Sequence, residues 1–293
     1  MKNTYLKRAG RTYGCAIGAS KAFDKVWRMG LFYKMIDKIS WIYWRVLYGY
    51  YDKSVIYMEI NNEISEEIKI DGGVKQGGPL SPKLYNIYVK AMIKKIEDIN
   101  MGALKETVKI SILVYADDIM LISPLKIGMT KMIIETQKYM QKLKIKINLD
   151  KTNFIQFGKR KIVDFELEIN NIRIDRVKTM KYLGMTFDEN MDFNEHIKDR
   201  SKKCMKAVYG LYTSGLLSRS MDLETKKYIY KTYCRPVLTY GMDIININEK
   251  SIKEIRTDES IFLKRILNVS KKSKNTLIYQ TMEIREPIYN IYI

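Results

Sequence analysis

Residues 111–123 of the chain, SILVYADDIMLIS, place two adjacent acidic residues, Asp117 and Asp118, between two short apolar runs. Apolar runs on either side of a short polar break are typical of two strands joined by a tight turn. Such a hairpin would hold both carboxylates at a rigid tip, where a bound cation offsets their mutual repulsion. Mg²⁺ suits this donor set because it takes one or two carboxylates together with substrate phosphates. The segment alone is equally compatible with an ordinary hairpin and a solvated turn.

A second segment, residues 72–86, reads GGVKQGGPLSPKLYN and is dense in glycine. Glycine lets the backbone approach a ligand closely, and Lys75 and Gln76 supply hydrogen-bond donors. Ser81 and Pro82 predict the start of a helix, with serine as the N-cap and proline at the first helical position. A helix N-terminus favours a phosphate group, although a flexible loop before a helix is a common alternative. The segment is not a P-loop, because no Gly-Lys-Ser/Thr follows it.

The composition of the 293-residue chain indicates a polyanionic partner. Lys and Arg total 52 and Asp and Glu total 33, a net charge of +19. That excess favours nucleic acid first and an anionic membrane surface second. The single histidine and three scattered cysteines exclude zinc sites and triads that need several imidazoles, and they make a disulfide framework improbable. The absence of a long apolar run argues against a membrane-spanning segment.

The hydrophobic pattern divides the chain into an α+β part, residues 1–188, and an all-helical part, residues 189–293. In the first part we expect strands at 12–17, 54–60, 64–70, 109–115, 119–122, 154–157, 165–169, 172–174 and 180–187, and helices at 27–39, 42–50, 81–99 and 129–144. Tight turns are expected at Asn61–Asn62 and Asn170–Asn171. In the second part we expect helices at 193–217, 223–238 and 250–267.

Three segments taken in order, SKAFDKVW (20–27), GVKQGGPLSPKLYN (73–86) and YADD (115–118), resemble motifs A, B and C of reverse transcriptases. The amino-acid sequences of these motifs are most similar to those of the non-LTR (LINE-type) retrotransposon branch. Group II intron enzymes share YADD but usually carry proline where this chain has Lys75. Downstream, LDKT (149–152), KYLG (181–184) and RPVLTYG (235–241) resemble motif D, the primer-grip strand (motif E) and the region after the thumb. The resemblance covers nearly the whole chain.

This resemblance implies a right-hand polymerase palm over residues 1–188, an antiparallel sheet with helices on one face, followed by a helical thumb and a post-thumb segment over 189–293. It implies an RNA-directed DNA polymerase that transfers nucleotides from dNTPs to a primer 3′-OH with two metal ions. The cofactor would be Mg²⁺, with Mn²⁺ as an alternative. The partners would be an RNA template, a DNA primer and dNTPs, with no membrane involved.

The resemblance also implies roles for single residues. Asp117 and Asp118 would be metal ligands, and Lys151 would protonate the pyrophosphate leaving group. Phe23 would be the gate that rejects a 2′-OH. The incoming nucleotide would meet Lys75, Gln76 and Gly77, and the primer end would be held by Tyr182, Leu183 and Gly184.

The chain departs from the family at motif A. The aspartate expected five positions before Phe23 is Gly18. Asp24 lies six residues further along, roughly 20 Å away in an extended strand at about 3.3 Å per residue, so it cannot replace that ligand. Only a short segment precedes motif A, so most of the fingers would be missing and the palm would expose apolar surface. We therefore expect polymerase activity to be low or absent. A non-catalytic nucleic-acid-binding remnant and a decayed transposon fragment remain open alternatives.

The location expected for the chain is intracellular, in a reducing compartment, and nuclear if the host is eukaryotic. The N-terminus lacks the apolar core of a signal peptide, and Cys15 is expected to be a buried, inert thiol. The basic run at 159–161 is expected to be solvated surface.

Overall fold

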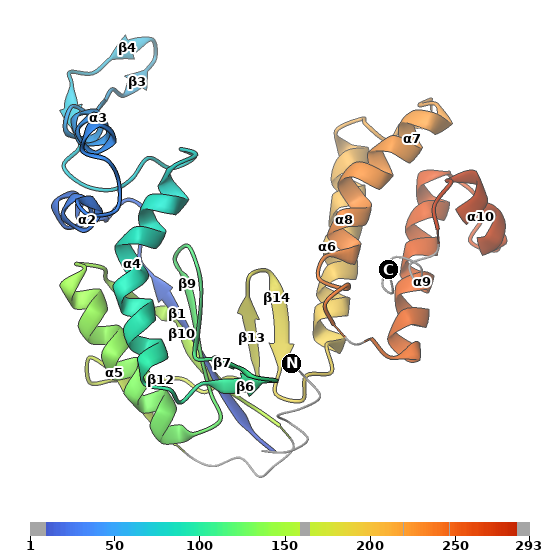
Figure 1. Cartoon of the computed structure of the whole chain (residues 1–293). Helices are drawn as coiled ribbons and strands as arrows, with labels where there is room; N and C mark the ends of the chain where they lie inside the picture. Colours follow the sequence, from blue (N-terminus) through green and yellow to red (C-terminus); the bar gives the residue numbers. More distant parts are fainter. Residues whose placement is uncertain (1–9, 159–164, 219, 246, 286–293) are drawn as a thin grey trace. The chain divides into compact units, whose positions relative to one another are not determined.

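The computed structural model describes residues 10–158, 165–218, 220–245 and 247–285, so the basic run at 159–161 lies outside the described residues. The chain divides into two compact units, Met1–Leu183 and Gly184–Ile293 (Figure 1). The division falls slightly before the one drawn from the sequence, because β14 (Met185–Asp188) packs on the first helix of the second unit through Met185.

The first unit is built on a four-stranded antiparallel sheet of order β10-β1-β9-β8. Its strands are β1 (Thr12–Ala19), β8 (Ile112–Tyr115), β9 (Asp118–Ser123) and β10 (Ile147–Phe157). Every residue of β1 is buried, because β9 and β10 flank it and both of its faces are covered. Burial raises the pKa of Cys15 to about 12, so its thiol is inert as expected.

Two helices, α4 (Ser81–Asp98) and α5 (Lys126–Lys142), pack against one face of this sheet (Figure 1). The main core lies between them and alternate residues of the strands, such as Ile17, Ile119 and Leu121. A smaller apolar cluster around Met120 and Met180 covers the opposite face. The predicted fold class, an α+β palm with an antiparallel sheet and helices on one face, is therefore confirmed for this unit.

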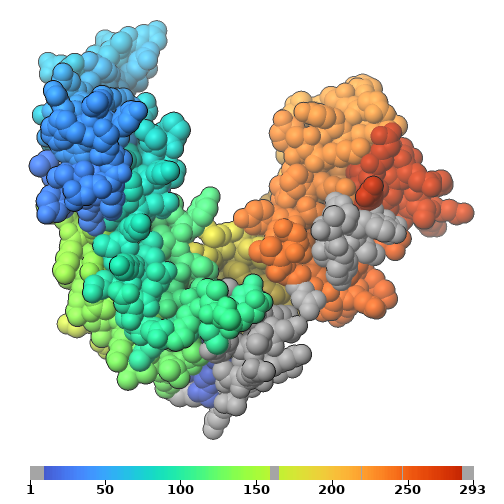
Figure 2. Space-filling view, viewed as in Figure 1, coloured from blue at the N-terminus to red at the C-terminus, as the bar shows by residue number. Residues whose placement is uncertain are grey.

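An arm of the first unit runs from α2 (Arg28–Met35) and α3 (Trp41–Asp52) into short paired strands (Figure 1). The predicted turn at Asn61–Asn62 is confirmed, since both residues are left-handed with φ of 52° and 65°. The two long strands expected on either side are broken into pairs of two residues each. These are β2 (Val55–Ile56) with β5 (Ile68–Lys69), and β3 (Glu59–Ile60) with β4 (Glu63–Ile64). Many of their apolar side chains are exposed. These strands lie in the light-blue surface of Figure 2.

The remaining pieces of the first unit are short. They are β6 (Ala103–Lys105), β7 (Val108–Ile110), β11 (Leu167–Ile169), β12 (Ile172–Ile174) and β13 (Thr179–Tyr182). The turn predicted at Asn170–Asn171 joins β11 to β12. The single strand predicted over 180–187 is wrong: Leu183 and Gly184 adopt left-handed φ of 46° and 73° and turn β13 back against β14.

The start of α4 also differs from the expectation. Leu80 occupies the N-cap position, and Ser81 is the first helical residue. The Ser81 hydroxyl donates to the carbonyl of Lys75 instead of accepting from a helix amide. The serine therefore closes the preceding glycine loop onto the helix and does not cap it.

The second unit is helical, as expected, and has its own core. Its helices are α6 (Asn194–Thr213), α7 (Leu223–Ile229), α8 (Arg235–Thr239), α9 (Glu249–Ile266) and α10 (Asn275–Thr281), with a π-helical turn, η1 (Tyr230–Cys234), between α7 and α8. The single helix predicted over 223–238 is thus three segments, and α10 was not expected. Among the described residues, no helix is long and apolar enough to cross a membrane.

His196 is fully buried near the start of α6. Its Nδ1 accepts a hydrogen bond from the amide of Thr186 at 3.3 Å, and its Nε2 donates to the carbonyl of Tyr240 at 3.0 Å. Burial is the main cause that lowers the pKa of His196 below 6.5, and the charges of Arg200 and Lys203 lower it further. The ring is therefore neutral in the folded chain at neutral pH.

This arrangement predicts acid sensitivity of the second unit. The unfolded chain binds the proton more readily, so the stability present above pH 6.5 is lost as the pH falls toward the folded pKa. Hydrogen exchange of α6 amides, measured at about pH 7.5 and about pH 5.5, should speed up at the lower pH after correction for intrinsic rates. The His196→Gln variant keeps one donor and one acceptor and should lose this extra sensitivity. An unchanged pH response in that variant would contradict the assignment.

Candidate active site

The two acidic residues lie at the turn of the β8–β9 hairpin, as the sequence predicts. Tyr115 pairs with Asp118, so Ala116 and Asp117 form the turn. Ala116 has a φ of 53°, in the left-handed region that is costly for any residue other than glycine or asparagine. The amide of Ala19 donates to the carbonyl of Asp117 at 3.2 Å and ties the turn to the end of β1.

Gly18, which stands where the resemblance leads us to expect the motif A aspartate, lies directly opposite Asp118 in the β1–β9 ladder. A side chain at this position would therefore stand beside the acidic turn, as the resemblance requires of a metal ligand. Glycine supplies no carboxylate there. Its amide instead donates a long hydrogen bond to the Thr152 hydroxyl at 3.4 Å.

On the other side of β1, strand β10 bulges next to Gly18. Ala16 pairs with Asn153, but Gly18 pairs with Asn148, so the intervening residues of β10 loop outward. The bulge carries Lys151 over Gly18: a Cβ built on the glycine would lie 2.8 Å from the Cβ of Lys151. The sequence predicted a strand only over 154–157, whereas β10 extends back to Ile147 and contains the whole LDKT motif.

The electrostatics of the turn follow from this packing. Burial and then the neighbouring Asp117 raise the pKa of Asp118, and the positive charge of Lys151 opposes the rise. The charge of Asp117 therefore disfavours the ionised form of Asp118, and Lys151 partly compensates this effect. A single divalent cation would do so more strongly.

The donor set does not fit a pair of metal ions. Within the described ranges, no group of three or more His, Cys, Asp or Glu side chains is placed to hold a metal. Asp24 does not fill the gap, because it accepts a hydrogen bond from Nε2 of Gln76 at 2.6 Å in the glycine loop. The site offers two carboxylates where a pair of ions sharing substrate oxygens needs a further anchor.

Tyr182 is brought to the acidic turn from β13. Its hydroxyl lies 3.5 Å from the carbonyl oxygens of both Leu113 and Asp118, toward which it can donate. Burial, followed by the charge of Asp118, raises its pKa to about 12, so the hydroxyl stays protonated. Of the three residues predicted to grip the primer, Tyr182 contacts the hairpin, while Leu183 and Gly184 form the turn between β13 and β14.

A second cluster holds the predicted gate. The Phe23 ring stacks on Tyr85 of α4 with centroids 5.1 Å apart and an interplanar angle of 24°. Tyr85 is almost completely buried, and its hydroxyl has no hydrogen-bond partner among the described residues. Burial and then the charge of Asp117 raise the Tyr85 pKa, which places this ring within electrostatic reach of the acidic turn.

The glycine loop is anchored to the segment that follows β1. The amides of Gly73 and Val74 donate to the carbonyls of Val26 and Phe23 at 2.9 and 2.8 Å. Arg28 reinforces the loop by donating from Nε to the carbonyl of Gly73 at 2.9 Å. The side chain of Gln76 reaches Asp24, as described above, so the loop is tied to the gate segment at several points.

The remaining loop residues are open to solvent. Lys75 and Gly77 are both exposed, and Gly77 has a φ of 74° with nothing within 4 Å of the position that a Cβ would occupy. Gly73 has a similar φ of 80°, but a Cβ there would lie 2.7 Å from the carbonyl oxygen of Asp24. An alanine at either position would have a strained backbone, but only an alanine at Gly73 would also clash with a neighbouring residue.

Replacing Gly73 by alanine should destabilise the first unit by about 2–3 kcal/mol, because it adds a backbone clash to the cost of a left-handed alanine. Gly77→Ala is the matched control and should cost only about 1 kcal/mol, since it carries the strain without the clash. Urea unfolding followed by the fluorescence of Trp27, Trp41 and Trp44, which all lie in this unit, measures both. Equal losses of unfolding free energy in the two variants would contradict the prediction that contact with Asp24 adds to the cost at Gly73.

Three residues of the site were not singled out from the sequence. They are Tyr85 behind the gate, Thr152 beneath Gly18, and Arg28 under the glycine loop. Tyr85 and Thr152 belong to motifs that the sequence analysis quotes. Tyr85 follows Ser81 by four positions in the predicted helix, so Ser81 and Tyr85 lie on the same helix face. Arg28 donates to a backbone carbonyl that is distant in sequence, so no local sequence pattern predicts its role.

The comparisons with known proteins identify the family of the chain. The family model described as "Reverse transcriptase (RNA-dependent DNA polymerase)" matches residues 1–187. That range contains the acidic turn, the glycine loop, Gly18, Lys151 and the whole β13 strand.

Several curated relatives align with most of the chain. It is 26% identical over 245 residues to "Probable RNA-directed DNA polymerase from transposon BS" of Drosophila melanogaster, covering 80% of the chain and 26% of the relative. It is 25% identical over 260 residues to "RNA-directed DNA polymerase from mobile element jockey" of the same species, covering 86% and 28%. A Popillia japonica Pol polyprotein from the type-1 retrotransposable element R2 is 26% identical, covering 69% and 34%. The chain thus spans about a quarter to a third of the length of these relatives.

Among solved structures, the chain is similar to telomerase from Candida tropicalis in complex with a fragment of telomeric RNA. The TM-score is 0.47 at 13% identity, covering 98% of the chain and 51% of the telomerase chain.

Proposed function

The chain belongs to the reverse transcriptase (RNA-dependent DNA polymerase) family, of the non-LTR retrotransposon type, and we propose that it is the palm and thumb region of such a polymerase. The proposed reaction joins the α-phosphate of a dNTP to the 3′-OH of a DNA primer paired with an RNA template. The observation that carries the proposal is the pairing of Gly18 with Asp118, because it puts the motif A and motif C positions side by side at one turn.

In this proposal the acidic turn binds a divalent cation, Mg²⁺ or Mn²⁺, through Asp117 and Asp118. Such an ion would supply charge neutralisation for phosphate oxygens when bound. Because the donor set does not fit two ions, we propose that nucleotide transfer by this chain is severely impaired or absent. Lys151, which lies over Gly18 and opposes the charge of Asp118, would be the proton donor for the departing pyrophosphate.

The nucleotide would lie against Phe23, with Lys75, Gln76 and Gly77 at its other side. Support for the gate comes from the stacking of Phe23 on Tyr85, because a ring backed by a buried aromatic resists displacement by a 2′-OH. Gln76 is held by Asp24 through its amide nitrogen, so its carbonyl oxygen can accept from a ligand. The two exposed residues, Lys75 and Gly77, would contribute a charge and a close backbone approach.

The primer end would meet Tyr182, Leu183 and Gly184. The Tyr182 hydroxyl lies over the carbonyl of Asp118, so a primer strand that contacts this ring would have its end near the acidic turn. The template–primer duplex is a polyanion, and the net charge of +19 suits it.

A second candidate is a non-catalytic nucleic-acid-binding remnant of the polymerase fold. Gly18 favours it, because the loss of one carboxylate affects chemistry and leaves the basic surface intact. The two candidates differ only in whether any nucleotide is transferred.

The test uses an RNA template annealed to a DNA primer, with dNTPs and Mg²⁺ or Mn²⁺. We expect the chain to bind the duplex with an affinity that falls steeply as salt rises. We expect primer extension to be at or near background, and Asp117→Ala to remove whatever remains while leaving duplex binding unchanged. Failure to bind the duplex at low salt would overturn both candidates. Extension that is fast and abolished by Asp117→Ala would show that the site is not impaired.

A further inference from the structure

The second unit contains a hollow of about 290 Å³ where three of its helices meet. Tyr209 and Tyr212 of α6, Lys226 of α7 and Arg265 of α9 line it, together with Ser218 and Asn268 from the segments that follow α6 and α9. None of these residues falls within the range matched by the polymerase family model. The hollow is therefore lined by residues other than those of the acidic turn and the glycine loop.

Lys226 is the unusual member of this group. It is only 7% exposed, yet within the described part of the chain its ammonium group has no hydrogen-bond or ion-pair partner. The next residue, Lys227, is buried to a similar degree, but its Nζ lies 2.7 Å from carboxylate oxygens of both Glu224 and Glu283. The Lys226 side chain lines the hollow, so its charge faces that space without a counter-ion, and an anion placed there would be stabilising.

The rest of the lining has the chemistry of an anion site. None of the described residues around the hollow carries a carboxylate, while Arg265 adds a second positive charge. The guanidinium of Arg265 lies over the Tyr209 ring, 4.7 Å from its centroid, and has no acidic partner in the described residues. Ser218 and Asn268 add neutral hydrogen-bond donors.

The helix ends at the hollow do not cancel this charge. α6 and α9 both end here, and a helix C-terminus is unfavourable for an anion. Several carbonyls of these last turns, however, already accept hydrogen bonds: Gly210 and Leu211 accept from the amides of Ser214 and Leu217, and Arg265 accepts from the amide of Asn268. The Tyr212 hydroxyl also donates to the carbonyl of Arg265, at 2.5 Å. Two full positive charges therefore outweigh the partial charges of the helix ends.

We infer that this hollow binds a phosphate group, held by Lys226 and Arg265 with Ser218 and Asn268 as neutral donors. A phosphate supplies the several acceptor oxygens that such a set of donors requires. The source is either a phosphodiester within a nucleic-acid strand or a terminal phosphate of a nucleotide. The site does not depend on the proposed polymerase activity.

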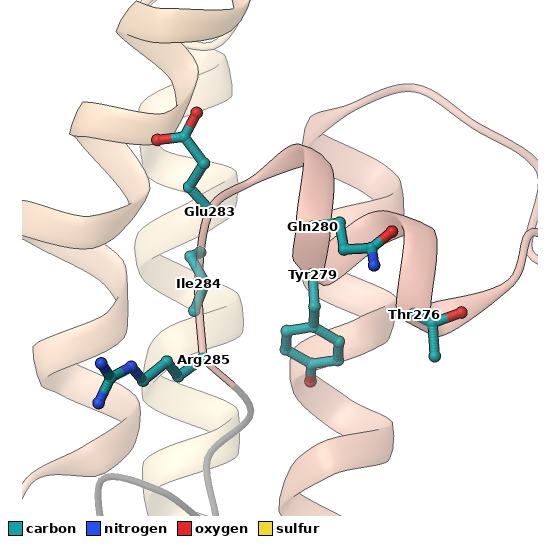
Figure 3. Close-up of a pocket in the computed structure, with 6 residues that line it drawn as sticks. All are labelled: Thr276, Tyr279, Gln280, Glu283, Ile284 and Arg285. Carbon is teal, nitrogen blue, oxygen red and sulfur yellow. The ribbon is translucent and has the colours of Figure 1, made fainter.

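Another hollow of the same unit, of about 370 Å³, shows the contrast (Figure 3). It is bounded by α10 and the segment after it, including Glu283 and Arg285. The carboxylate of Glu283 already pairs with Lys227, so its charge is compensated. That hollow carries no comparable indication of a ligand.

The test measures the melting temperature of the full chain against increasing inorganic phosphate, thymidine 5′-monophosphate or the dinucleotide TpT, with chloride at matched ionic strength as the blank. A ligand that binds only the folded chain raises the melting temperature in a saturable way. We expect such a rise with the unaltered chain and a loss of at least about tenfold in apparent affinity in Lys226→Met. Without phosphate, Lys226→Met should melt close to the unaltered chain, because methionine keeps the apolar packing of the mostly buried stem and no ion pair is lost.

Lys227→Met is the matched control: it is adjacent, similarly buried and ion-paired, so it should lower the melting temperature but keep the phosphate response. Arg265→Gln should reduce the phosphate-induced rise in melting temperature without abolishing it, because Lys226 remains in place. Stabilisation by TpT identifies an internal phosphodiester as the ligand, and stabilisation only by the monophosphate or phosphate identifies a terminal phosphate. No saturable response to any of the three, or an identical response in Lys226→Met, would overturn the inference.

Discussion

Replacing Gly18 by aspartate is expected to raise the affinity of the chain for Mn²⁺ by about 10- to 100-fold, an effect comparable to that of other ligand-shell changes in metal sites. The reason is the register of β1 and β9, which puts residue 18 opposite Asp118. A carboxylate at this position adds a third hard oxygen donor to the pair at the turn. Electron paramagnetic resonance of free Mn²⁺, titrated with protein and then competed with Mg²⁺, measures the change.

The control for this substitution is Gly18→Asn, which has the same size and no charge. Any side chain at residue 18 must displace the stem of Lys151, because a Cβ would lie 2.8 Å from the Lys151 Cβ. Asparagine carries this steric cost without the carboxylate, so it should not gain affinity. Equal Mn²⁺ affinity of the aspartate and asparagine variants would contradict the assignment of Gly18 as the missing ligand position.

Glu259 is the second position where a large effect is expected. Its side chain is fully buried in the second unit and accepts hydrogen bonds from Tyr230 at 3.0 Å, Arg235 at 3.0 Å and Tyr279 at 3.1 Å. Burial raises the pKa of Glu259, while Arg235 and the two hydroxyls oppose the rise. Glu259→Ala leaves the guanidinium of Arg235 buried without its counter-ion, and we expect a loss of about 3–5 kcal/mol in the free energy of unfolding.

Hydrogen exchange of amides in α6 and α9 reports this loss specifically for the second unit. Glu259→Gln is the control, because it keeps the shape and the acceptor oxygen and removes the charge, so it should cost less than the alanine variant. A Glu259→Ala chain that exchanges as slowly as the unaltered one would show that the network does not hold α9 against the rest of the unit.

Local pattern was sufficient for the elements that depend on neighbouring residues. The apolar runs around Asp117 and Asp118 predicted the hairpin, and the paired asparagines at 61–62 and 170–171 predicted turns that the structure contains. In each case the decisive interactions lie within a few positions along the chain, where side-chain alternation and left-handed propensity can be read directly.

The errors arose where a distant contact or a backbone detail decided the outcome. The apolar pattern of 180–187 suits one strand, but Leu183 and Gly184 both take left-handed conformations and reverse the chain. The helix predicted over 223–238 breaks into α7, η1 and α8 because Pro236 cannot donate to a carbonyl one turn earlier, and the preceding turn widens into a π-helix.

The candidate site shows the same division. The motif residues could be identified one by one, but their mutual contacts could not. The bond from Gln76 to Asp24 spans 52 positions, and the stacking of Phe23 on Tyr85 depends on how α4 packs beneath the gate. Lys151 reaches Gly18 only because β10 bulges at that point, which no local pattern indicates.

The most direct test of the central claim, that Gly18 leaves the acidic turn without a metal ligand that nucleotide transfer needs, is primer extension by the Gly18→Asp variant. The assay compares it with the unaltered chain, with Gly18→Asn and with the Gly18→Asp/Asp117→Ala double variant on one RNA template and DNA primer. We predict at least about 100-fold more extension by Gly18→Asp than by the other three, as expected when a transition-state charge regains its stabilisation. Extension by the unaltered chain equal to that of Gly18→Asp would contradict the claim, and so would duplex binding without any gain in extension by Gly18→Asp.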